Sequence, residues 1–351
     1  MAMLTKLQSL SLLLLLLLLL FTEPISGESP SGCGESEHET CRNSARALKY
    51  KIIAIASILV ASILGVSLPL VLRQVPIFSP EKDLFTLVKA FASGVILATG
   101  YMHVLPDSFD DLRSDCLPDN PWKKFPFSTF VAMISALLTL MVESFAMSRF
   151  QKSNPESNNF VADENPSVRA KEGNEMVHFH AIEAGHQEST KLLKHRVVAQ
   201  VLEMGIVVHS VVIGLSMGAS DNPCTIRPLV IAICFHQFFE GMGLGGCIVQ
   251  AEYGLRMKAI LVFFFASTTP FGIALGIGIS KVYSEDSPTA LIVEGLLNAA
   301  SAGLLQYMAL VELLAADFLG PKLQGNAKLQ LWAFVCVFGG AGLMSLMAKW
   351  A

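Results

Sequence analysis

The chain has 351 residues, of which 52% are hydrophobic and 15% are charged, whereas about 25% of the residues of an ordinary soluble domain are charged. Its 25 Lys and Arg nearly balance its 29 Asp and Glu, so the formal net charge is -4 and no general basic surface for nucleic acid is expected. The apolar residues are gathered into blocks long enough to cross a bilayer. A soluble enzyme and a nucleic-acid-binding protein are therefore both disfavoured.

The first segment, residues 1–27, has the pattern of a secretory signal peptide. Lys6 precedes a Leu-rich run at residues 10–21, and small and polar residues follow around Ser26 and Gly27. We expect cleavage near Ser26 or Gly27, with an uncleaved anchor helix as the alternative. In either case the chain enters the secretory pathway.

The next segment, residues 28–50, is expected to be extracellular and contains Cys33 and Cys41. A disulfide is permitted on that side of the membrane, so these two thiols are a candidate pair. Cys116 and Cys224 are also expected outside and could pair with them or with each other. The other cysteines lie inside apolar blocks, where we expect small buried thiols: Cys234, Cys247 and Cys336.

Eight apolar blocks follow, each long enough to cross about 30 Å of hydrocarbon as a helix. They cover residues 51–72, 89–106, 125–148, 197–219, 228–250, 258–280, 288–317 and 329–348. The expected fold class is therefore an all-α integral membrane protein, with three transmembrane helices over 51–148 and five over 197–351. If the signal peptide is removed, both ends lie outside.

The distribution of basic residues tests that orientation. Loops and loop edges expected in the cytosol hold 14 Lys and Arg, and those expected outside after the first span hold 6. Four more precede the first span and weaken the contrast. The orientation nevertheless agrees with the positive-inside rule.

The longest connection, residues 149–196, is expected to be a cytosolic loop. It is rich in charge, Asn and Ser and contains two prolines, a composition that favours disorder. His178, His180 and His186 lie within it and are candidates for cytosolic metal sensing. The alternative is a solvated loop that happens to contain histidines, because their spacing fixes no coordination geometry.

Ionisable residues interrupt several of the blocks. Placing such a group in hydrocarbon costs upward of about 2.5 kcal/mol, so it normally faces a polar path or a partner. The interrupting residues are His103, Asp107, Glu143, Glu203, His209, His236, Glu240, Glu294 and Glu312. Every charged member is an acid, and Lys and Arg avoid the same depths. That pattern suits a path for a cation.

The fourth and fifth blocks provide the strongest candidate site. His209 lies 12 residues from the cytosolic end of its block, and His236 lies 8 residues from the outer end of the next. At the helical rise these distances are about 18 and 12 Å, so the two imidazoles reach nearly the same depth. Glu240 is one turn from His236 on the same face. Ser210 and Gln237 lie beside them as further polar groups.

Neutral imidazole and carboxylate ligands suit Zn(II), Fe(II) and related divalent ions, whereas thiolates and thioethers would suit Cu(I). A hydrogen-bonded core residue is the alternative for a lone buried histidine. Small residues line the same two blocks and would let the fourth and fifth helices approach closely, or serve ordinary membrane packing. These are Gly214, Gly218, Gly241, Gly243, Gly245 and Gly246.

The remaining polar groups divide by depth. Three acids fall in the cytosolic half and form a candidate exit path: Glu143, Glu203 and Glu312. Three groups fall in the outer half and form a candidate entrance path: His103, Asp107 and Glu294. For any single acid, a capped helix end or an interfacial carboxylate is the alternative.

The stretches HSVVIGLSMG, from His209 to Gly218, and HQFFEGMGLGG, from His236 to Gly246, resemble the ZIP family of zinc/iron-regulated transporter-like proteins, and its plant branch in particular. The eight spans with a long loop after the third are also similar. The resemblance implies a secondary carrier that moves Zn(II), and also Fe(II), Mn(II) or Cd(II), toward the cytosol. It implies a homodimer in which helices one, four, five and six slide against the other four.

By this likeness, the transport-site ligands are His209, His236 and Glu240, and the supporting polar groups are Ser210 and Gln237. His103 lies near the outer entrance, and Glu312 lies on the exit side. The metal is cargo, and no cofactor is expected. We expect the plasma membrane as the location, with an endomembrane such as the vacuole as the alternative. Some family members have carboxylates where this chain has Ile213 and Thr269, so we expect one principal ion and weaker discrimination among divalent ions.

Two other functions compete with that of a carrier. A divalent-cation channel would use the same residues, because the sequence does not report whether both gates open together. An intramembrane metalloenzyme would need an HExxH helix or a comparable arrangement of base and open coordination position. The chain has HQFFE at residues 236–240 and no GxSxG pattern. We therefore expect that the protein is not an enzyme.

Overall fold

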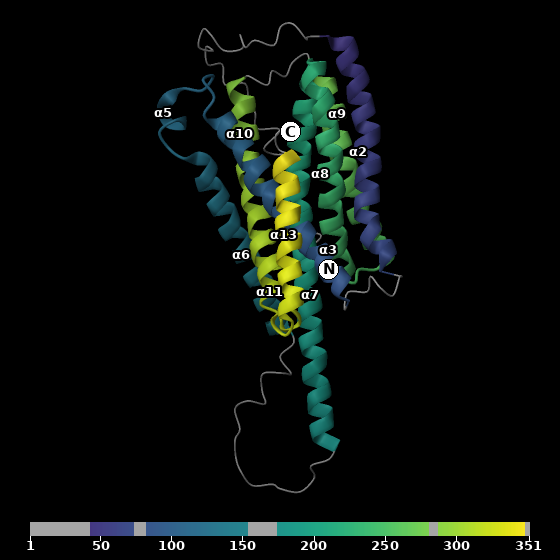
Figure 1. The fold of residues 1–351 in the computed structure, drawn as a ribbon. Helices are drawn as coiled ribbons and strands as arrows, with labels where there is room; N and C mark the ends of the chain where they lie inside the picture. Colours follow the sequence, from purple (N-terminus) through teal and green to yellow (C-terminus); the bar gives the residue numbers. More distant parts are fainter. Residues whose placement is uncertain (1–42, 74–81, 154–173, 281–286, 348–351) are drawn as a thin grey trace.

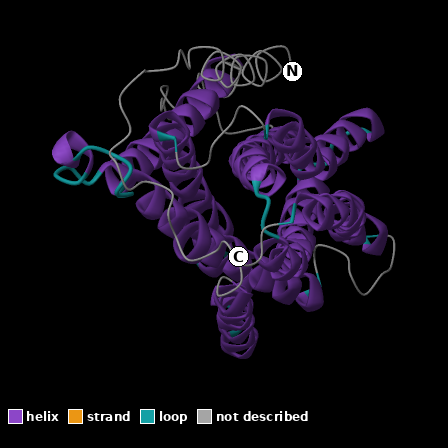
Figure 2. Cartoon of the chain, turned by 90° about the horizontal axis from the view of Figure 1, so that it is seen from above, coloured by secondary structure: helices purple, strands orange, loops and turns teal. Residues whose placement is uncertain are grey.

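The computed structural model describes residues 43–73, 82–153, 174–280 and 287–347. Within these ranges the regular structure is entirely helical, with no strand (Figure 2). Eight helices in this part are long and apolar enough to cross a membrane, which confirms the expected all-α fold class and number of spans. The expected signal peptide lies outside the described residues.

The first three spans come from the segments before the long connection. They are α2 (Ser44–Leu72), then α3 (Asp83–Thr99), η3 (Gly100–Val104) and α4 (Leu105–Leu112) as one continuous span, and, after the short α5 (Asp119–Trp122), α6 (Phe127–Ser153). Asn43 caps the first of these helices, because its side-chain oxygen accepts a hydrogen bond from the backbone N–H of Arg46 at 3.0 Å.

The other five spans follow the long connection. They are α7 (Asn174–Ala219), α8 (Pro223–Gln250), α9 (Leu255–Ile279), the continuous α10 (Pro288–Tyr307), η5 (Met308–Ala315) and α11 (Ala316–Phe318), and, after the short α12 (Pro321–Gln324), α13 (Ala327–Met347). Asn222 and Ser287 cap the helices that begin after them, accepting from the backbone N–H of Cys224 at 3.0 Å and of Ala290 at 3.3 Å.

Helix α7 begins earlier than the sequence indicated. Residues 174–196 were expected in the cytosolic loop, but they form the first part of this helix, which projects beyond the bundle at the end opposite to α5 (Figure 1). These residues contain no proline and are rich in Glu, Ala, Leu and Lys, which favour helix. His178, His180 and His186 belong to this part, where only the backbone is described, so metal sensing there stays a prediction.

The spans form two groups, defined by which helices pack together most extensively. The first, named here the mobile group after the sliding that the resemblance implies for it, consists of α2, α7, α8 and α9. The second, named here the scaffold group, contains α3 packed on α13, and α10 packed on α4 and α6, with η3 between α3 and α10 and with η5 continuing α10. The two groups meet along α7 against α10 and along α3 against α8.

Glycines allow the closest approaches, but between different helices from those expected. A Cβ atom on Gly214 would lie 2.6 Å from the carbonyl oxygen of Thr269, and one on Gly218 would lie 2.3 Å from that of Ile273. These residues therefore bring α7 against α9. Gly245 brings α8 against α2 in the same way, because its Cβ would lie 2.5 Å from the carbonyl oxygen of Val66.

The expectation that these glycines join the fourth helix to the fifth is therefore wrong. The motif gives the capacity for close approach, whereas the order of the helices in the bundle decides which neighbour uses it. Gly241 also faces α2, Gly243 faces the side chain of Ile96 on α3, and a Cβ atom on Gly246 would meet nothing within 4 Å. The facing sides of α7 and α8 instead carry histidines.

The outer faces of some spans are suited to lipid. In α6 only 17% of the most apolar window is buried, against 67% in α7. Exposed large side chains on α6 include Met133, Leu137 and Phe145, and those on α13 include Leu331 and Phe338. Such exposed apolar surface is stable in hydrocarbon and not in water. The chain is therefore a multi-pass membrane protein.

Candidate metal site

Three histidines from three helices meet inside the bundle: His103 of η3, His209 of α7 and His236 of α8. Their ring centroids are 5.4 Å apart for His103 and His209, 5.6 Å for His103 and His236, and 5.5 Å for His209 and His236. All three are buried. A point equidistant from the three centroids lies about 3.2 Å from each. A Zn–N bond takes about 2.0–2.1 Å of this distance, and the remaining length of about 1 Å matches the separation of a ring nitrogen from the ring centroid. The triangle has the size that one ion requires.

Glu240 adds a carboxylate to this triangle. It lies one turn after His236 on α8, with its Oε2 atom 3.3 Å from the Nε2 atom of His236. The Glu240 side chain has no exposed surface. The structure thus brings together His209, His236 and Glu240 as the helical-rise argument expected, at one depth and from two helices.

The buried ring nitrogens and carboxylate oxygens of this cluster make no hydrogen bonds with the described residues. Both ring nitrogens of His209 and His236, and both carboxylate oxygens of Glu240, make no hydrogen bond in the described part of the chain. Buried polar atoms are normally satisfied, so a group of unsatisfied lone pairs requires an explanation. Imidazole nitrogens and a carboxylate around one point fit a borderline divalent ion as cargo.

The side chains are not arranged as a complete coordination shell. Among the described residues, no group of three or more His, Cys, Asp or Glu side chains is positioned to hold a metal ion. The three rings pack edge to face, with interplanar angles of 71° to 84°. Binding therefore requires the rings to rotate toward the common centre, while the backbone already places them at the right separation.

The sequence assigned His103 to the entrance path, whereas the structure places it in the central cluster. The reason is local: Gly100–Val104 is a π-helical segment, in which an extra residue per turn shifts the direction of the side chains, often at functional sites. One signal was present in the sequence. His103 and Asp107 have the same spacing as His236 and Glu240, and their Nδ1 and Oδ2 atoms lie 3.6 Å apart.

The two polar groups beside the histidines differ in their contacts. The Ser210 hydroxyl is buried without a hydrogen-bond partner among the described residues, next to His209. The Gln237 amide instead donates from Nε2 to the Ser62 hydroxyl on α2 at 3.3 Å. Ser210 is thus available to the site, whereas Gln237 links two helices of the mobile group.

Near the expected entrance residues Asp107 and Glu294 lies a further acid, Asp111, that the sequence pattern did not single out. Asp111 lies on α4, one turn after Asp107, and its Oδ2 atom accepts a hydrogen bond from the Asn298 amide at 3.4 Å. Glu294 is buried one turn before Asn298 on α10. The entrance acids thus belong to facing surfaces of α4 and α10. Asp111 was missed because it falls beyond the apolar block.

On the inner side, two of the three exit acids come together around a lysine. The Nζ atom of Lys194 lies 3.2 Å from Oε2 of Glu312 and 3.8 Å from Oε1 of Glu143. The Tyr307 hydroxyl donates to the other oxygen of Glu143 at 2.8 Å. Glu203 has both carboxylate oxygens buried without a hydrogen-bond partner in the described part of the chain.

Lys194 corrects the expectation that lysines avoid the depth of these acids. It belongs to α7, in the segment that the sequence analysis expects in the cytosol, and its long apolar stem carries the ammonium group to the carboxylates. A lysine stem can lie along apolar surface while its charged end reaches a polar partner. Sorting charges by the depth of the Cα atom does not detect such a side chain.

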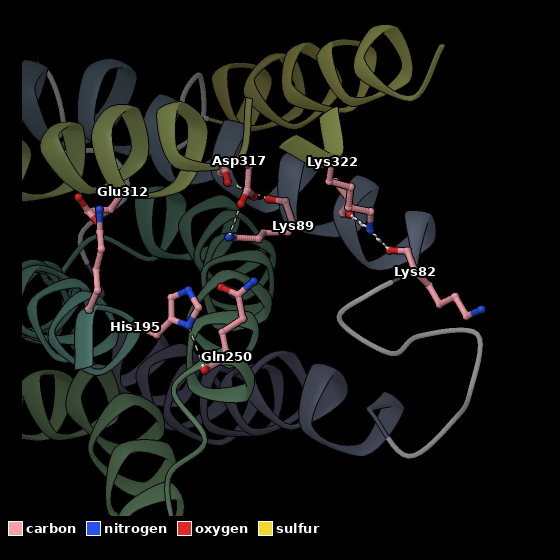
Figure 3. Close-up of polar contacts among 10 residues, drawn as sticks. Lys82, Lys89, His195, Gln250, Glu312, Asp317 and Lys322 are labelled. Atoms are coloured by element: carbon pink, nitrogen blue, oxygen red, sulfur yellow. Dashed lines mark hydrogen bonds and ion pairs between the residues drawn. The ribbon is translucent and has the colours of Figure 1, made fainter. Parts of the chain in front are cut away.

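A cavity of about 540 Å³ opens beside this cluster, and charged and polar side chains form part of its lining, including Lys89, Lys194, His195, Glu312 and Asp317. Figure 3 shows the ion pair between Lys89 Nζ and Asp317 Oδ1, at 2.9 Å, with Glu312 along the same side. His195 also lines the cavity, and its Nδ1 atom lies 3.2 Å from the carbonyl oxygen of Gln250 (Figure 3). The end of the bundle that the sequence places in the cytosol therefore holds a cavity with charged side chains in its lining.

The loop between α8 and α9 holds this end of α7 in place. The Tyr253 hydroxyl donates to the carbonyl oxygen of Arg196 at 2.9 Å, and the Arg196 guanidinium lies over the Tyr253 ring, 5.6 Å from its centroid. Burial raises the pKa of the Tyr253 phenol, so it remains a neutral donor. The attachment fixes the backbone beside Lys194.

The cysteines fall into two groups. Cys116 and Cys224, both of which the sequence analysis expects outside, are disulfide-bonded, as an oxidising compartment would permit. Cys234, Cys247 and Cys336 are free thiols; Cys247 is buried as expected, whereas Cys234 and Cys336 are only partly buried. Cys33 and Cys41 lie outside the described residues, so the disulfide suggested between them stays a prediction.

Comparisons with known proteins agree with these features. The family model described as ZIP zinc transporter matches residues 48–348. The chain is 58% identical over 332 residues to Fe(2+) transport protein 1 of Oryza sativa subsp. japonica, covering 89% of this chain and 86% of the relative. It is 56% identical over 326 residues to Zinc transporter 7 of Arabidopsis thaliana, covering 90% and 89%. It is 52% identical over 328 residues to Fe(2+) transport protein 1 of Arabidopsis thaliana, covering 93% of each.

Proposed function

The chain belongs to the ZIP family of zinc transporters, and we propose that it carries divalent transition-metal ions, with Zn(II) as the principal cargo, into the cytosol. The observation that supports this proposal is the cluster of His103, His209, His236 and Glu240. It combines three buried imidazoles with one buried carboxylate, and the donors of His209, His236 and Glu240 have no hydrogen-bond partners in the described part of the chain.

The charge of this site suits transport. Three neutral imidazoles and one carboxylate leave a bound divalent ion with a net charge of +1. A carrier site must bind strongly enough to take up its cargo and weakly enough to release it. A site with more carboxylates would neutralise the ion fully and hold it longer.

The position of the site supports a sliding mechanism. His209, His236 and Glu240 belong to the mobile group, and His103 belongs to the scaffold group. Sliding one group along the other would therefore separate one ligand from the remaining three. We propose that this loss of a ligand releases the ion toward the acids on the cytosolic side. A channel, in which all four ligands stay together, is the competing proposal.

The positions of Ile213 and Thr269 bear on metal preference. Ile213 adds no charge one turn after His209, and Thr269 places a buried hydroxyl on α9 that has no hydrogen-bond partner among the described residues. We propose that one ion binds at a time and that Zn(II), Fe(II), Mn(II) and Cd(II) compete for the site. Relatives named for iron and for zinc are similarly close to this chain. Competition uptake that showed strict preference for one metal would contradict this part of the proposal.

No catalytic role and no resident cofactor form part of the proposal, because the metal is the cargo. We propose the plasma membrane as the location, with the vacuolar membrane as the alternative, and a homodimer as the assembly. A fluorescent fusion, examined together with membrane fractionation, tests the location. Light scattering of the purified protein tests the homodimer.

Uptake of radioactive zinc tests the proposed function. In a host that lacks its own importers, the full chain should give saturable uptake. His209→Ala, His236→Ala and Glu240→Ala should each abolish it while the protein still reaches the membrane. Asp119→Ala, which removes an exposed carboxylate outside the spans, is the control for Glu240→Ala and should retain uptake. Normal uptake in all three site variants would refute the proposal.

A further inference from the structure

The exit acids are already bridged by a cation that belongs to the chain. The ammonium group of Lys194 on α7 lies 3.2 Å from Glu312 on η5 and 3.8 Å from Glu143 on α6. These distances make it a shared partner of two carboxylates from two different spans. Because α7 is in the mobile group and the other two elements are in the scaffold group, the contact crosses the boundary between the groups.

The charges of this cluster do not balance. One ammonium group faces two carboxylates, so the cluster has an excess negative charge that a divalent ion would remove. The Glu312 side chain is only 2% exposed, and its Oε2 atom makes no hydrogen bond within the described part of the chain, although Lys194 is its ion-pair partner. Glu143 is held by the Tyr307 hydroxyl at 2.8 Å on one oxygen and faces Lys194 with the other.

The Lys194 side chain has room to leave while its backbone is fixed. The side chain is 40% exposed and lines the cytosolic cavity of about 540 Å³. The next two residues tie the helix to the end of α8, since His195 contacts the carbonyl oxygen of Gln250 and Arg196 donates to that of Ala251 at 3.1 Å. The ammonium group can therefore move between the acids and the cavity without movement of α7.

We propose that Lys194 is a built-in competitor of the transported ion. An ammonium group and a metal ion repel each other at this distance, so the Glu143–Glu312 pair holds one of them at a time. An arriving ion displaces Lys194 into the cavity, and the returning ammonium group displaces the ion into the cytosol. The direction of this exchange rests on the proposed transport function, whereas the competition itself does not.

Zinc binding to the purified full chain tests the competition directly. The central site is first removed with His236→Ala and Glu240→Ala, so that the result does not depend on transport. On that background Lys194→Met should raise the affinity for Zn(II) by about 10-fold or more, because it leaves two acids without their cation. Adding Glu143→Gln and Glu312→Gln should remove the gain.

Two further variants make the outcome decisive. Lys191→Met removes an exposed lysine one turn earlier on α7 and should give no gain, and Lys194→Arg should bind as the parent does because it keeps the charge. If Lys194→Met is not monodisperse, Lys194→Gln is measured with the same expectation. Unchanged affinity in the Lys194 variant, or an equal gain in Lys191→Met, would overturn the proposal.

A rate measurement in cells then distinguishes this role from a purely structural one. With the central site intact, Lys194→Met should lower the maximal uptake rate several-fold and leave the apparent KM for external zinc unchanged or lower, because release becomes slower while binding outside is unaffected. A raised KM with an unchanged maximal rate would contradict a role in release. If the wild-type chain gave no uptake, only the proposed function would fail, since the binding experiment would still stand.

Discussion

The central histidine cluster and the cytosolic acid cluster satisfy their buried polar groups in different ways. At the centre, the ring nitrogens of His209 and His236 and the carboxylate oxygens of Glu240 make no hydrogen bonds with the described residues. Most of the side chains in this cluster are imidazoles, and only Glu240 is an acid. At the cytosolic end, Glu143 and Glu312 are acids with a lysine between them. The first region therefore leaves buried nitrogens and oxygens without hydrogen bonds, apart from the 3.3 Å contact of Glu240 with His236, whereas the second pairs its acids with a basic side chain.

We propose that this difference gives the two regions different roles along one path. A set of mainly neutral ligands, one of which moves away when the helix groups slide, is suited to binding and release of an ion. Acids with an internal counter-ion are suited to receiving the ion briefly, because the counter-ion limits how tightly they hold it. Substitutions at the centre should therefore weaken binding, and substitutions at the cytosolic end should change rates.

Among the variants that compare the two regions, the largest effect is expected at His103, whose assignment the structure changed. His103→Ala removes a central ligand, so the apparent affinity for external zinc should fall by about 10- to 100-fold, as for losses around other metal sites. Asp107→Asn, one turn away and facing the outer side, should weaken it less. Initial uptake rates over a range of zinc concentrations measure both. If His103→Ala and Asp107→Asn weakened the affinity equally, His103 would be assigned to the entrance path and not to the central cluster.

An intermediate effect is expected at the glycine contacts that position His209. Gly214→Ala would place a methyl group 2.6 Å from a backbone oxygen of α9, and such overpacking commonly costs about 1–3 kcal/mol. Thermal unfolding of the purified protein should show a lower Tm, and zinc affinity at the centre should fall with it. Gly246→Ala, whose new methyl group would meet nothing within 4 Å, is the matched control. Equal Tm values for the two variants would show that this contact does not constrain α7.

The smallest effect is expected at Tyr307. Tyr307→Phe removes one hydrogen bond to Glu143. Such a bond contributes about 1 kcal/mol, so Glu143 is held less firmly in its orientation. The maximal uptake rate should change by about two- to five-fold, with the KM for external zinc unchanged. A change confined to KM would place Tyr307 with the binding residues and would remove the distinction between the two regions.

Much of the architecture could be predicted from the sequence, because hydrocarbon requires helices of a fixed minimum length. The convergence of His209 and His236 followed from the same geometry, since both lie on regular helices with a known rise. The central role of His103 did not follow, because the π-helical turn at Gly100–Val104 changes the side-chain direction without altering the apolar pattern.

The remaining differences arise from tertiary contacts and from local propensity. Lys194 reaches the acids through the length of its side chain, which a residue's position in the sequence does not report. The helix partners of Gly214 and Gly245 depend on the arrangement of the bundle and not on the motif in which each glycine lies. Helix formation over residues 174–196 prevailed over a composition that favoured disorder, because helix propensity within the segment is high.

X-ray absorption of the purified, zinc-loaded protein reports the ligands of the transport site itself. We expect a first shell of nitrogen and oxygen only, with histidine nitrogens at about 2.0–2.1 Å and multiple-scattering features of about three imidazoles, reduced by one in His103→Ala. A first shell that contained sulfur, or one that His103→Ala and His236→Ala both left unchanged, would contradict a transport site formed by these three histidines and Glu240.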